Sequence, residues 1–307
     1  MSRPADSSVA EIAVVIVTYQ SAADLSACVG SLAAAAGPHP LEAVVVDNAS
    51  RDESVEIARD LGVKVIENHT NEGLSRAINR GVAATSAPWL LVANPDTRLA
   101  PGAVTRLLET GAADERIGCV GPRLLNPDGS RYPTGRRFPS LLVGSVHAVV
   151  APFWPTNPAT RRYHMVEVDR HAPVEVDWVS GACMLIRRSA FEAVGGFDPA
   201  YFMYFEEMDF CLRLARTGWR VIFDPLATVE HTVGGSTRSA PYRKVVNHHR
   251  SALRFYCRWY AHDPRLLLAP VVAVSLLLRA LASIGRTWVG RRGTPSHQSG
   301  THAPTDA

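Results

Sequence analysis

Residues 88–99 read Pro-Trp-Leu-Leu-Val-Ala-Asn-Pro-Asp-Thr-Arg-Leu. Trp89 to Ala93 is a continuous apolar run that is too short for a typical helix, so it predicts a strand buried on both faces. Pro95 cannot donate a hydrogen bond to a ladder of strands and therefore ends this one. Asp96 is then expected at the carboxyl edge of a sheet, where open α/β sheets bind their ligands.

A carboxylate at that edge can hold a hard divalent cation through oxygen, and the cation can in turn hold a diphosphate. The alternative is that Asn94-Pro95-Asp96 is only a turn, a role in which all three residue types are common. This segment alone leaves both interpretations open.

The composition is that of a globular protein with room for a proper core. Of 307 residues, 47% are hydrophobic and 20% are charged, which allows one large domain or two small ones. The net charge of +3 gives no indication of a nucleic-acid partner. The five cysteines include no Cys-x-x-Cys pair, so they predict neither a zinc site nor a disulfide framework and fit a reducing compartment. Residues 1–11 are polar and do not resemble a signal peptide, and we expect them to be disordered.

Strand and helix patterns alternate through the first 120 residues, with short connections. Such alternation is typical of an α/β fold with a doubly wound, mostly parallel sheet. The predicted strands are Ile12 to Thr18, Ala43 to Val46, Val63 to Glu67, Trp89 to Ala93 and Ile117 to Val120. The predicted helices are Ser21 to Ala36, a helix ending at Leu61, Gly73 to Ala84 and Pro101 to Thr110.

The turn after the first strand carries Tyr19-Gln20-Ser21 and no glycine. A dinucleotide fingerprint or a P-loop needs glycines there, so that the backbone can approach phosphate closely. Phosphate must therefore be held in another way, which again favours a metal ion at Asp96.

The second half of the chain is less regular. Residues 131–171 are rich in proline, arginine and aromatic residues without a clear period, which predicts a long functional or mobile loop. After it we expect a helix that ends at Arg216 and four short strands, Val174 to Val179, Ala182 to Arg187, Val221 to Phe223 and Thr228 to Glu230.

The C-terminal part, residues 241–290, predicts a basic helix followed by an apolar one. The apolar segment, Leu266 to Ile284, is at the short end for a spanning helix, contains Arg279 and is flanked by further arginines. These features favour a helix or shallow hairpin that lies on a membrane surface, and the alternative is a core helix of a soluble domain. Residues 291–307 are expected to form a disordered tail.

Nine short motifs follow one another in an order that identifies a family. They are Val14 to Tyr19, Val45 to Ser50, Asn71 to Gly73, Asn79 to Gly81, Asn94 to Asp96, Gly121 to Arg123, Trp178 to Leu185, Gly196 to Asp198 and Phe202 to Cys211. From about Ile12 to Tyr260 the chain resembles the family 2 glycosyltransferases of GT-A fold, within them the rhamnosyltransferase-like branch that builds bacterial cell-wall polysaccharide. The resemblance implies a Rossmann-like GT-A catalytic domain over residues 12–240.

The resemblance also implies roles for residues that bind the donor and its metal ion. Asp47 matches the aspartate that accepts a hydrogen bond from the pyrimidine ring, and Thr18 and Tyr19 match the strand end beside that ring. Asp96 matches the last acid of an Asp-x-Asp motif, in which Asn94 replaces the first acid. His231 matches a histidine that completes the shell of a Mn²⁺ or Mg²⁺ ion in some members, although a capping or core role is the alternative.

Glu206-Glu207-Met208-Asp209 matches the quartet that carries the catalytic base of this family. The position of the base falls on Glu207, with Glu206 and Asp209 as the other candidates. The alternative is that these acids only stabilise the first turn of a helix. The resemblance assigns the remaining motif residues to substrate binding, namely Asn48, Asn71, Gly73, Asn79, Trp178, Gly181 and Ala182.

Taken together, these roles imply an inverting transferase that moves rhamnose from dTDP-rhamnose to a lipid-linked sugar such as N-acetylglucosaminyl-diphosphoryl polyprenol. We expect it at the cytoplasmic face of the membrane as a peripheral protein. Another UDP- or dTDP-sugar transferase of family 2 is the main alternative. A processive synthase would have glutamine where Phe255 stands before Arg258-Trp259, and a sugar-phosphate nucleotidyltransferase would have a glycine-rich first loop. A binding module without activity would not need the acidic quartet.

Overall fold

A computed structural model describes residues 10–138, 171–232 and 241–292, together with residues 154, 157, 158 and 161. The chain divides into two compact units, residues 1–238 and residues 239–307. Most of the predicted long loop, the ends of the chain and residues 233–240 lie outside the described residues.

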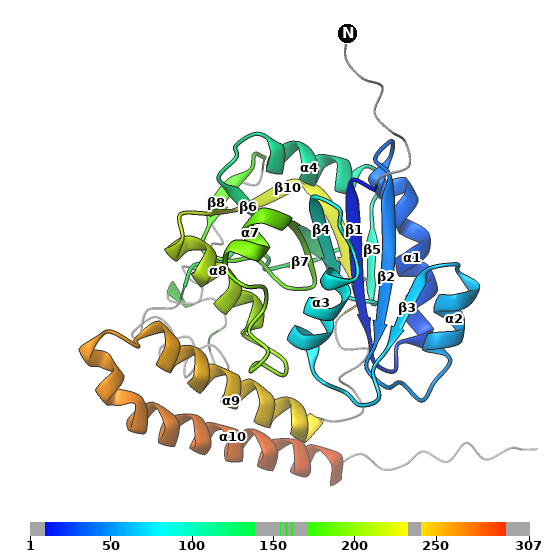
Figure 1. Cartoon of the computed structure of the whole chain (residues 1–307). Helices are drawn as coiled ribbons and strands as arrows, with labels where there is room; N and C mark the ends of the chain where they lie inside the picture. Colours follow the sequence, from blue (N-terminus) through cyan, green and yellow to red (C-terminus); the bar gives the residue numbers. More distant parts are fainter. Residues whose placement is uncertain are drawn as a thin grey trace, which may run out of the picture. The chain divides into compact units, whose positions relative to one another are not determined.

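The first unit is built on one sheet of ten strands (Figure 1). Its main path runs β3-β2-β1-β4-β9-β6-β10-β5, with β7 paired to β6 and β8 paired to β10. The strands are β1 (Ile12–Thr18), β2 (Leu41–Asp47), β3 (Lys64–Glu67), β4 (Trp89–Ala93), β5 (Thr97–Leu99), β6 (Ile117–Leu125), β7 (Arg131–Tyr132), β8 (Val174–Val176), β9 (Cys183–Arg187) and β10 (Arg220–His231).

The first half of the sheet confirms the predicted parallel arrangement. Strands β3, β2, β1 and β4 are all parallel, and Thr18 pairs with Asp47 at the ends of β1 and β2. Every residue of β4 is buried, as its unbroken apolar sequence requires. The predicted turn therefore begins at the carboxyl edge of the sheet, directly after Ala93.

The second half of the sheet is mixed. Strand β9 runs antiparallel to both of its neighbours, β4 and β6, whereas β10 runs parallel to β6. One strand of 12 residues, β10, replaces the two short strands that we predicted. Its pairing with β6 shifts between Asp224 and Thr228. Pro225 cannot donate to the ladder there, and the Asp224 carboxylate accepts a hydrogen bond from the backbone N–H of Leu226 at 2.9 Å.

Helices cover the sheet and leave its carboxyl edge to the loops. They are α1 (Ala22–Ala36), α2 (Ser54–Asp60), α3 (Leu74–Ala83), α4 (Ala103–Ala112), α7 (Arg188–Ala193) and α8 (Glu206–Arg216). Helix α3 packs closely on β1 and β2, because Gly81 presents no side chain there: a Cβ at this position would lie 2.5 Å from Val15 Cγ1.

The second unit contains α9 (Pro241–Trp259), the 3₁₀ helix η1 (Pro264–Leu268) and α10 (Ala269–Arg292), with α9 packed against α10. Thus α10 extends two residues into the segment that was predicted as a disordered tail. The Tyr256 hydroxyl donates to the backbone oxygen of Arg265 and ties α9 to η1.

Within the described residues, Pro264–Ile284 is long and apolar enough to cross a membrane by length and composition, with a mean hydropathy of 2.2. Only 6% of its most apolar window is buried. Its most exposed side chains are Leu267, Val271, Val274, Leu277, Leu278 and Leu281. Such exposure argues against a core helix of a soluble domain.

Candidate active site

Asp47 lies at the carboxyl edge of the sheet inside a cluster of hydrogen bonds. Its side chain accepts from Thr18 Oγ1 at 2.9 Å, from Ser50 Oγ at 2.5 Å and from the Ser50 backbone N–H at 2.8 Å. A carboxylate offers about four acceptor directions, so one remains for the N–H of a ligand. Ser50 ends the Val45 to Ser50 motif but was not among the predicted site residues. It also accepts from the Gln20 backbone N–H at 2.9 Å and so fixes the turn that carries Tyr19.

Asn48 and Asn71 shape the neighbouring loop. Asn48 donates to the backbone oxygen of Gly73 at 3.2 Å and accepts from Asn68 at 2.7 Å. Asn71 accepts from the Gly73 backbone N–H at 3.0 Å. The two asparagines therefore use their amides to hold the chain at Gly73, next to the edge where Asp47 lies.

Gly73 links this loop to the segment that precedes α8. It has a positive φ of 87°, and a Cβ at this position would lie 2.6 Å from the backbone oxygen of Phe202. The same oxygen accepts from the Leu74 backbone N–H at 2.7 Å. Tyr204 and Phe205, which follow, also have positive φ, a strained conformation that is concentrated at functional sites.

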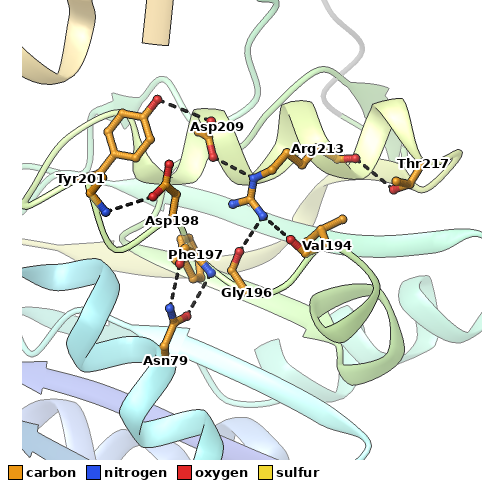
Figure 2. A network of polar contacts seen from close by, with 10 residues as sticks. Asn79, Val194, Gly196, Phe197, Asp198, Tyr201, Asp209, Arg213 and Thr217 are labelled. Carbon is orange, nitrogen blue, oxygen red and sulfur yellow. Dashed lines mark hydrogen bonds and ion pairs between the residues drawn. The ribbon is translucent and has the colours of Figure 1, made fainter. Parts of the chain in front are cut away.

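Asn79 is bonded to the chain at both ends of its amide (Figure 2). Its nitrogen donates to the Phe197 oxygen at 2.7 Å, and its oxygen accepts from the Phe197 N–H at 2.9 Å. These bonds fix the Gly196-Phe197 turn against α3. Both ends of the Asn79 amide therefore have a structural use in holding this turn.

Asp209 is completely buried and is paired with Arg213 (Figure 2). Arg213 Nε donates to its carboxylate at 2.8 Å, and the Tyr201 hydroxyl donates at 3.4 Å. Arg213 also donates to the backbone oxygens of Val194 and Gly196, at 2.6 and 2.7 Å. Through Arg213, Asp209 thus joins α8 to the turn before it. Because its carboxylate is already paired with a guanidinium, Asp209 is poorly suited to accept a proton from a substrate.

Glu206 and Glu207 form a different pair at the first turn of α8. Among the described residues, Oε2 of each has no hydrogen-bond partner, although both atoms are inaccessible to solvent. Burial raises the pKa of Glu206 well above its usual range, and the charge of Glu207 raises it further. Burial also raises the pKa of Glu207, against a smaller lowering by Arg136. Buried carboxylates without partners and with raised pKa values are typical of catalytic sites.

The loop of residues 178–182 lies directly against Glu207. A Cβ at Gly181 would lie 3.4 Å from Glu207 Cβ and 3.7 Å from its Cδ, so a larger residue there would crowd the carboxylate. The backbone oxygen of Ala182 accepts from the Asn94 N–H at 2.8 Å. One short loop therefore connects the candidate base with the Asn94-Pro95-Asp96 turn.

Arg136 is a residue of this site that the sequence did not reveal. Its guanidinium carbon lies 4.7 Å from the centre of the Trp178 ring and 5.6 Å from that of Tyr132. The Trp178 indole donates to the backbone oxygen of Arg137 at 3.2 Å. The only signal was that Arg136 falls in an arginine-rich segment that was predicted to be functional.

Asp96 and His231 meet at the edge of the sheet, as the family resemblance predicts. His231 Nε2 lies 3.3 Å from Asp96 Oδ1 and 3.5 Å from Asn94 Nδ2. They meet because β5 pairs antiparallel with β10, which sets Thr97 opposite His231. The ring of Tyr132 contacts the imidazole edge-on at 5.9 Å.

This arrangement fits a divalent cation that is shared with a diphosphate. Two ligands at right angles around Mg²⁺ lie about 3.0 Å apart, close to the distance between Asp96 and His231. Among the described residues, no group of three or more His, Cys, Asp or Glu side chains is placed to hold a metal ion without further ligands. The protein would thus supply the Asp96 carboxylate, the His231 imidazole and the Asn94 amide oxygen, and diphosphate oxygens and water would complete the shell.

Two family models match the chain. The one described as glycosyl transferase family 2 matches residues 13–195, and the one described as glycosyl transferase family group 2 matches residues 149–291. The chain is also 36% identical over 293 residues to the N-acetylglucosaminyl-diphospho-decaprenol L-rhamnosyltransferase of Mycobacterium tuberculosis, a match that covers 89% of this chain and 94% of that protein.

Solved structures show the same fold. The mannosyltransferase PcManGT from Pyrobaculum calidifontis, in complex with GDP-Man and Mn²⁺, gives a TM-score of 0.56 at 15% identity and covers 92% of this chain and 77% of its own. GalNAc-T7 with UDP, GalNAc and Mn²⁺ gives a TM-score of 0.55 at 20% identity and covers 80% and 48%. The chain has the GT-A fold and belongs to the rhamnosyltransferase-like members of glycosyl transferase family 2.

Proposed function

We propose that this glycosyltransferase moves rhamnose, with inversion, from dTDP-rhamnose to an N-acetylglucosaminyl-diphosphoryl polyprenol. The observation that carries the proposal is the 36% identity, over almost the whole of both chains, with the M. tuberculosis enzyme that is named for this acceptor. The geometry supports it, because Asp47 would bind the nucleotide, the Asp96–His231 pair would hold the cation of the diphosphate, and the Glu206–Glu207 pair would act on the acceptor hydroxyl.

Each group of residues would make one contribution to the reaction. The free acceptor direction of Asp47 would receive the ring N–H of the pyrimidine. Asp96, His231 and Asn94 would hold a divalent cation, which neutralises the charge on the leaving diphosphate when it is bound. Glu207 would take the proton of the acceptor hydroxyl as that oxygen attacks the sugar from the face opposite the diphosphate.

A panel of donors tests this assignment. The purified protein would be given the lipid-linked acceptor, Mg²⁺ or Mn²⁺, and in turn dTDP-rhamnose, UDP-sugars and GDP-mannose, with release of nucleoside diphosphate as the readout. We expect dTDP-rhamnose to give the highest kcat/KM, and chelation of the metal to stop turnover. A preference for a UDP-hexose would assign the protein to another transferase of the family.

We further propose that the protein is held at the cytoplasmic face of the membrane through α10. Five of its side chains, Val271, Val274, Leu277, Leu278 and Leu281, are each between 57% and 63% exposed. Burial of one such side chain contributes about 1.5–3 kcal/mol. Together with the flanking arginines, these apolar residues can hold a peripheral helix on anionic lipid.

Removal of the chain after Tyr260 is expected to abolish binding to anionic liposomes, because it removes every one of these apolar residues. Val274→Asp combined with Leu278→Asp should have the same effect while α10 keeps its length. Leu226→Asp, at a position of the first unit that is 53% exposed, is the matched control and should bind as the wild type does. Undiminished sedimentation of the truncated protein with liposomes would show that α10 does not hold the membrane.

A further inference from the structure

The second unit has a strong positive charge that the proposed chemistry does not use. Residues 241–292 contain ten arginines and lysines and a single acid, Asp263. Asp263 accepts hydrogen bonds from Arg265 at 2.6 and 2.8 Å, so it is already engaged next to η1. Half of the basic residues, and none of the acids, belong to α9.

Three arginines of α9 lie on one face of the helix. Arg250, Arg254 and Arg258 are spaced at intervals of four residues, which brings their side chains into one row. They line a cavity of about 350 Å³ together with Leu253 and Cys257, which come from the same face. The cavity therefore combines three guanidinium groups with an apolar wall.

This combination indicates the chemical class of the ligand. The planar guanidinium matches the oxygens of a phosphate with two parallel hydrogen bonds, so a row of three suits more than one phosphate group. The apolar wall suits a hydrocarbon attached to those phosphates. A prenyl diphosphate has both parts, whereas a nucleoside diphosphate would meet an apolar wall where its polar ribose should lie.

The arginine row and the contact with η1 lie on opposite sides of α9. Tyr256 faces η1, since its hydroxyl donates to Arg265. Residues two positions apart on a helix point about 200° apart, so Arg254 and Arg258 point away from η1.

We propose that Arg250, Arg254 and Arg258 bind the diphosphate of the lipid-linked acceptor, and that Leu253 and Cys257 contact the beginning of its prenyl chain. This inference rests on the proposed function for the acceptor class. It assigns to α9 a specificity role, in which the enzyme distinguishes an acceptor that carries a prenyl diphosphate from a free sugar.

The test compares two acceptors in detergent solution: N-acetylglucosaminyl-diphosphoryl polyprenol, and an alkyl N-acetylglucosaminide without a diphosphate. The variant replaces Arg250, Arg254 and Arg258 by alanine, the residue with the highest helix propensity. We expect the KM for the diphosphate acceptor to rise at least about tenfold, since three charge-assisted contacts are removed. The KM for the alkyl acceptor and for dTDP-rhamnose should stay at the wild-type value.

Two further variants control the experiment. Lys244→Ala removes an exposed positive charge of α9 that does not line the cavity, and it should leave both KM values unchanged. Replacement of the three arginines by lysine keeps the charge but not the planar fork, and should raise the KM for the diphosphate acceptor by an intermediate factor.

Three results would overturn the proposal. The first is an unchanged KM for the diphosphate acceptor in the alanine variant. The second is an equal rise for both acceptors, which would show that the row does not recognise the diphosphate. The third is loss of binding to phosphatidylglycerol vesicles with normal KM values, which would make the row a contact for bulk lipid. Failure of the wild-type protein to use any prenyl diphosphate acceptor would instead refute the proposed function itself.

Discussion

Replacement of Glu207 by glutamine is expected to lower kcat at least about a hundredfold, with little change in donor affinity. An alcohol is a poor nucleophile at neutral pH, and a positioned general base typically contributes about two to four orders of magnitude in rate. Glu207 is placed for this role, because it lies against Gly181, a position with no side chain, and its Oε2 has no partner among the described residues. Steady-state kinetics with dTDP-rhamnose and the lipid-linked acceptor would measure the loss.

Variants of the neighbouring acids show whether the base has been assigned correctly. Glu207→Asp should keep partial activity, since the carboxylate remains at a shorter reach. Asp209→Asn should lower the stability of the fold, because it leaves the partly buried Arg213 guanidinium without its charged partner. An active Glu207→Gln enzyme together with an inactive Glu206→Gln enzyme would move the base to Glu206.

The pH dependence of kcat follows from the raised pKa of the pair. A base acts only when it is deprotonated, so kcat should fall as the pH decreases through a value above 4.5, the ordinary value for a glutamate. Glu207 is faced by Glu206 on α8, by Tyr204 before the helix and by Arg136 after β7. Burial and the two glutamates raise the pKa of Tyr204 to about 12, so this hydroxyl stays neutral throughout. Arg136→Met should move the acidic limb of the kcat–pH profile to higher pH. The reason is that the positive charge of Arg136 lowers the pKa of Glu207, and the variant removes that charge.

Replacement of Asp96 by alanine is expected to lower kcat/KM at least about a thousandfold. Stabilisation of developing charge by a bound cation contributes several kcal/mol, and every 1.36 kcal/mol corresponds to a factor of ten in rate. Asp96 lies 3.3 Å from His231 and is the one charged ligand of the proposed set, so its loss removes the strongest protein ligand. His231→Ala should weaken metal binding less, because it leaves the charged ligand in place.

The loss of activity has to be linked to the metal ion. Mn²⁺ binding in the presence of dTDP would be followed by electron paramagnetic resonance for the wild type, Asp96→Ala and His231→Ala. The affinity for Mn²⁺ should be highest for the wild type, lower for His231→Ala and lowest for Asp96→Ala. Full activity of Asp96→Ala in the presence of a chelator would refute the metal site.

The sequence predicted the parallel half of the fold because each of its signals is local. The apolar run from Trp89 to Ala93 and the proline that follows it are sufficient to define β4 and its end. The hairpin between β6 and β7 also has a local signal, because its turn is Asn126-Pro127-Asp128-Gly129, which consists of common turn residues. Strand β5 has only three residues and is held by its pairing with β10, so no local pattern could have revealed it.

The site was predicted less completely, since most of its contacts join distant parts of the chain. The proximity of Asp96 and His231 followed from the family resemblance and not from spacing. Glu206 and Asp209 are three residues apart and share one face of a helix. This periodicity cannot show that Asp209 pairs with Arg213 while Oε2 of Glu206 has no partner among the described residues. The bonds between Asn79 and Phe197 are equally invisible in sequence, because they are formed only when α3 packs beside the turn before α8.

The stereochemistry of the product tests the central claim most directly. The purified protein would be incubated with dTDP-rhamnose, N-acetylglucosaminyl-diphosphoryl polyprenol and Mg²⁺, and the lipid product would be examined by nuclear magnetic resonance. A direct displacement assisted by Glu207 predicts a single rhamnosyl residue on the acceptor sugar, with an anomeric configuration opposite to that of the donor. A product with the configuration of the donor, or with no rhamnose on the lipid, would contradict the account.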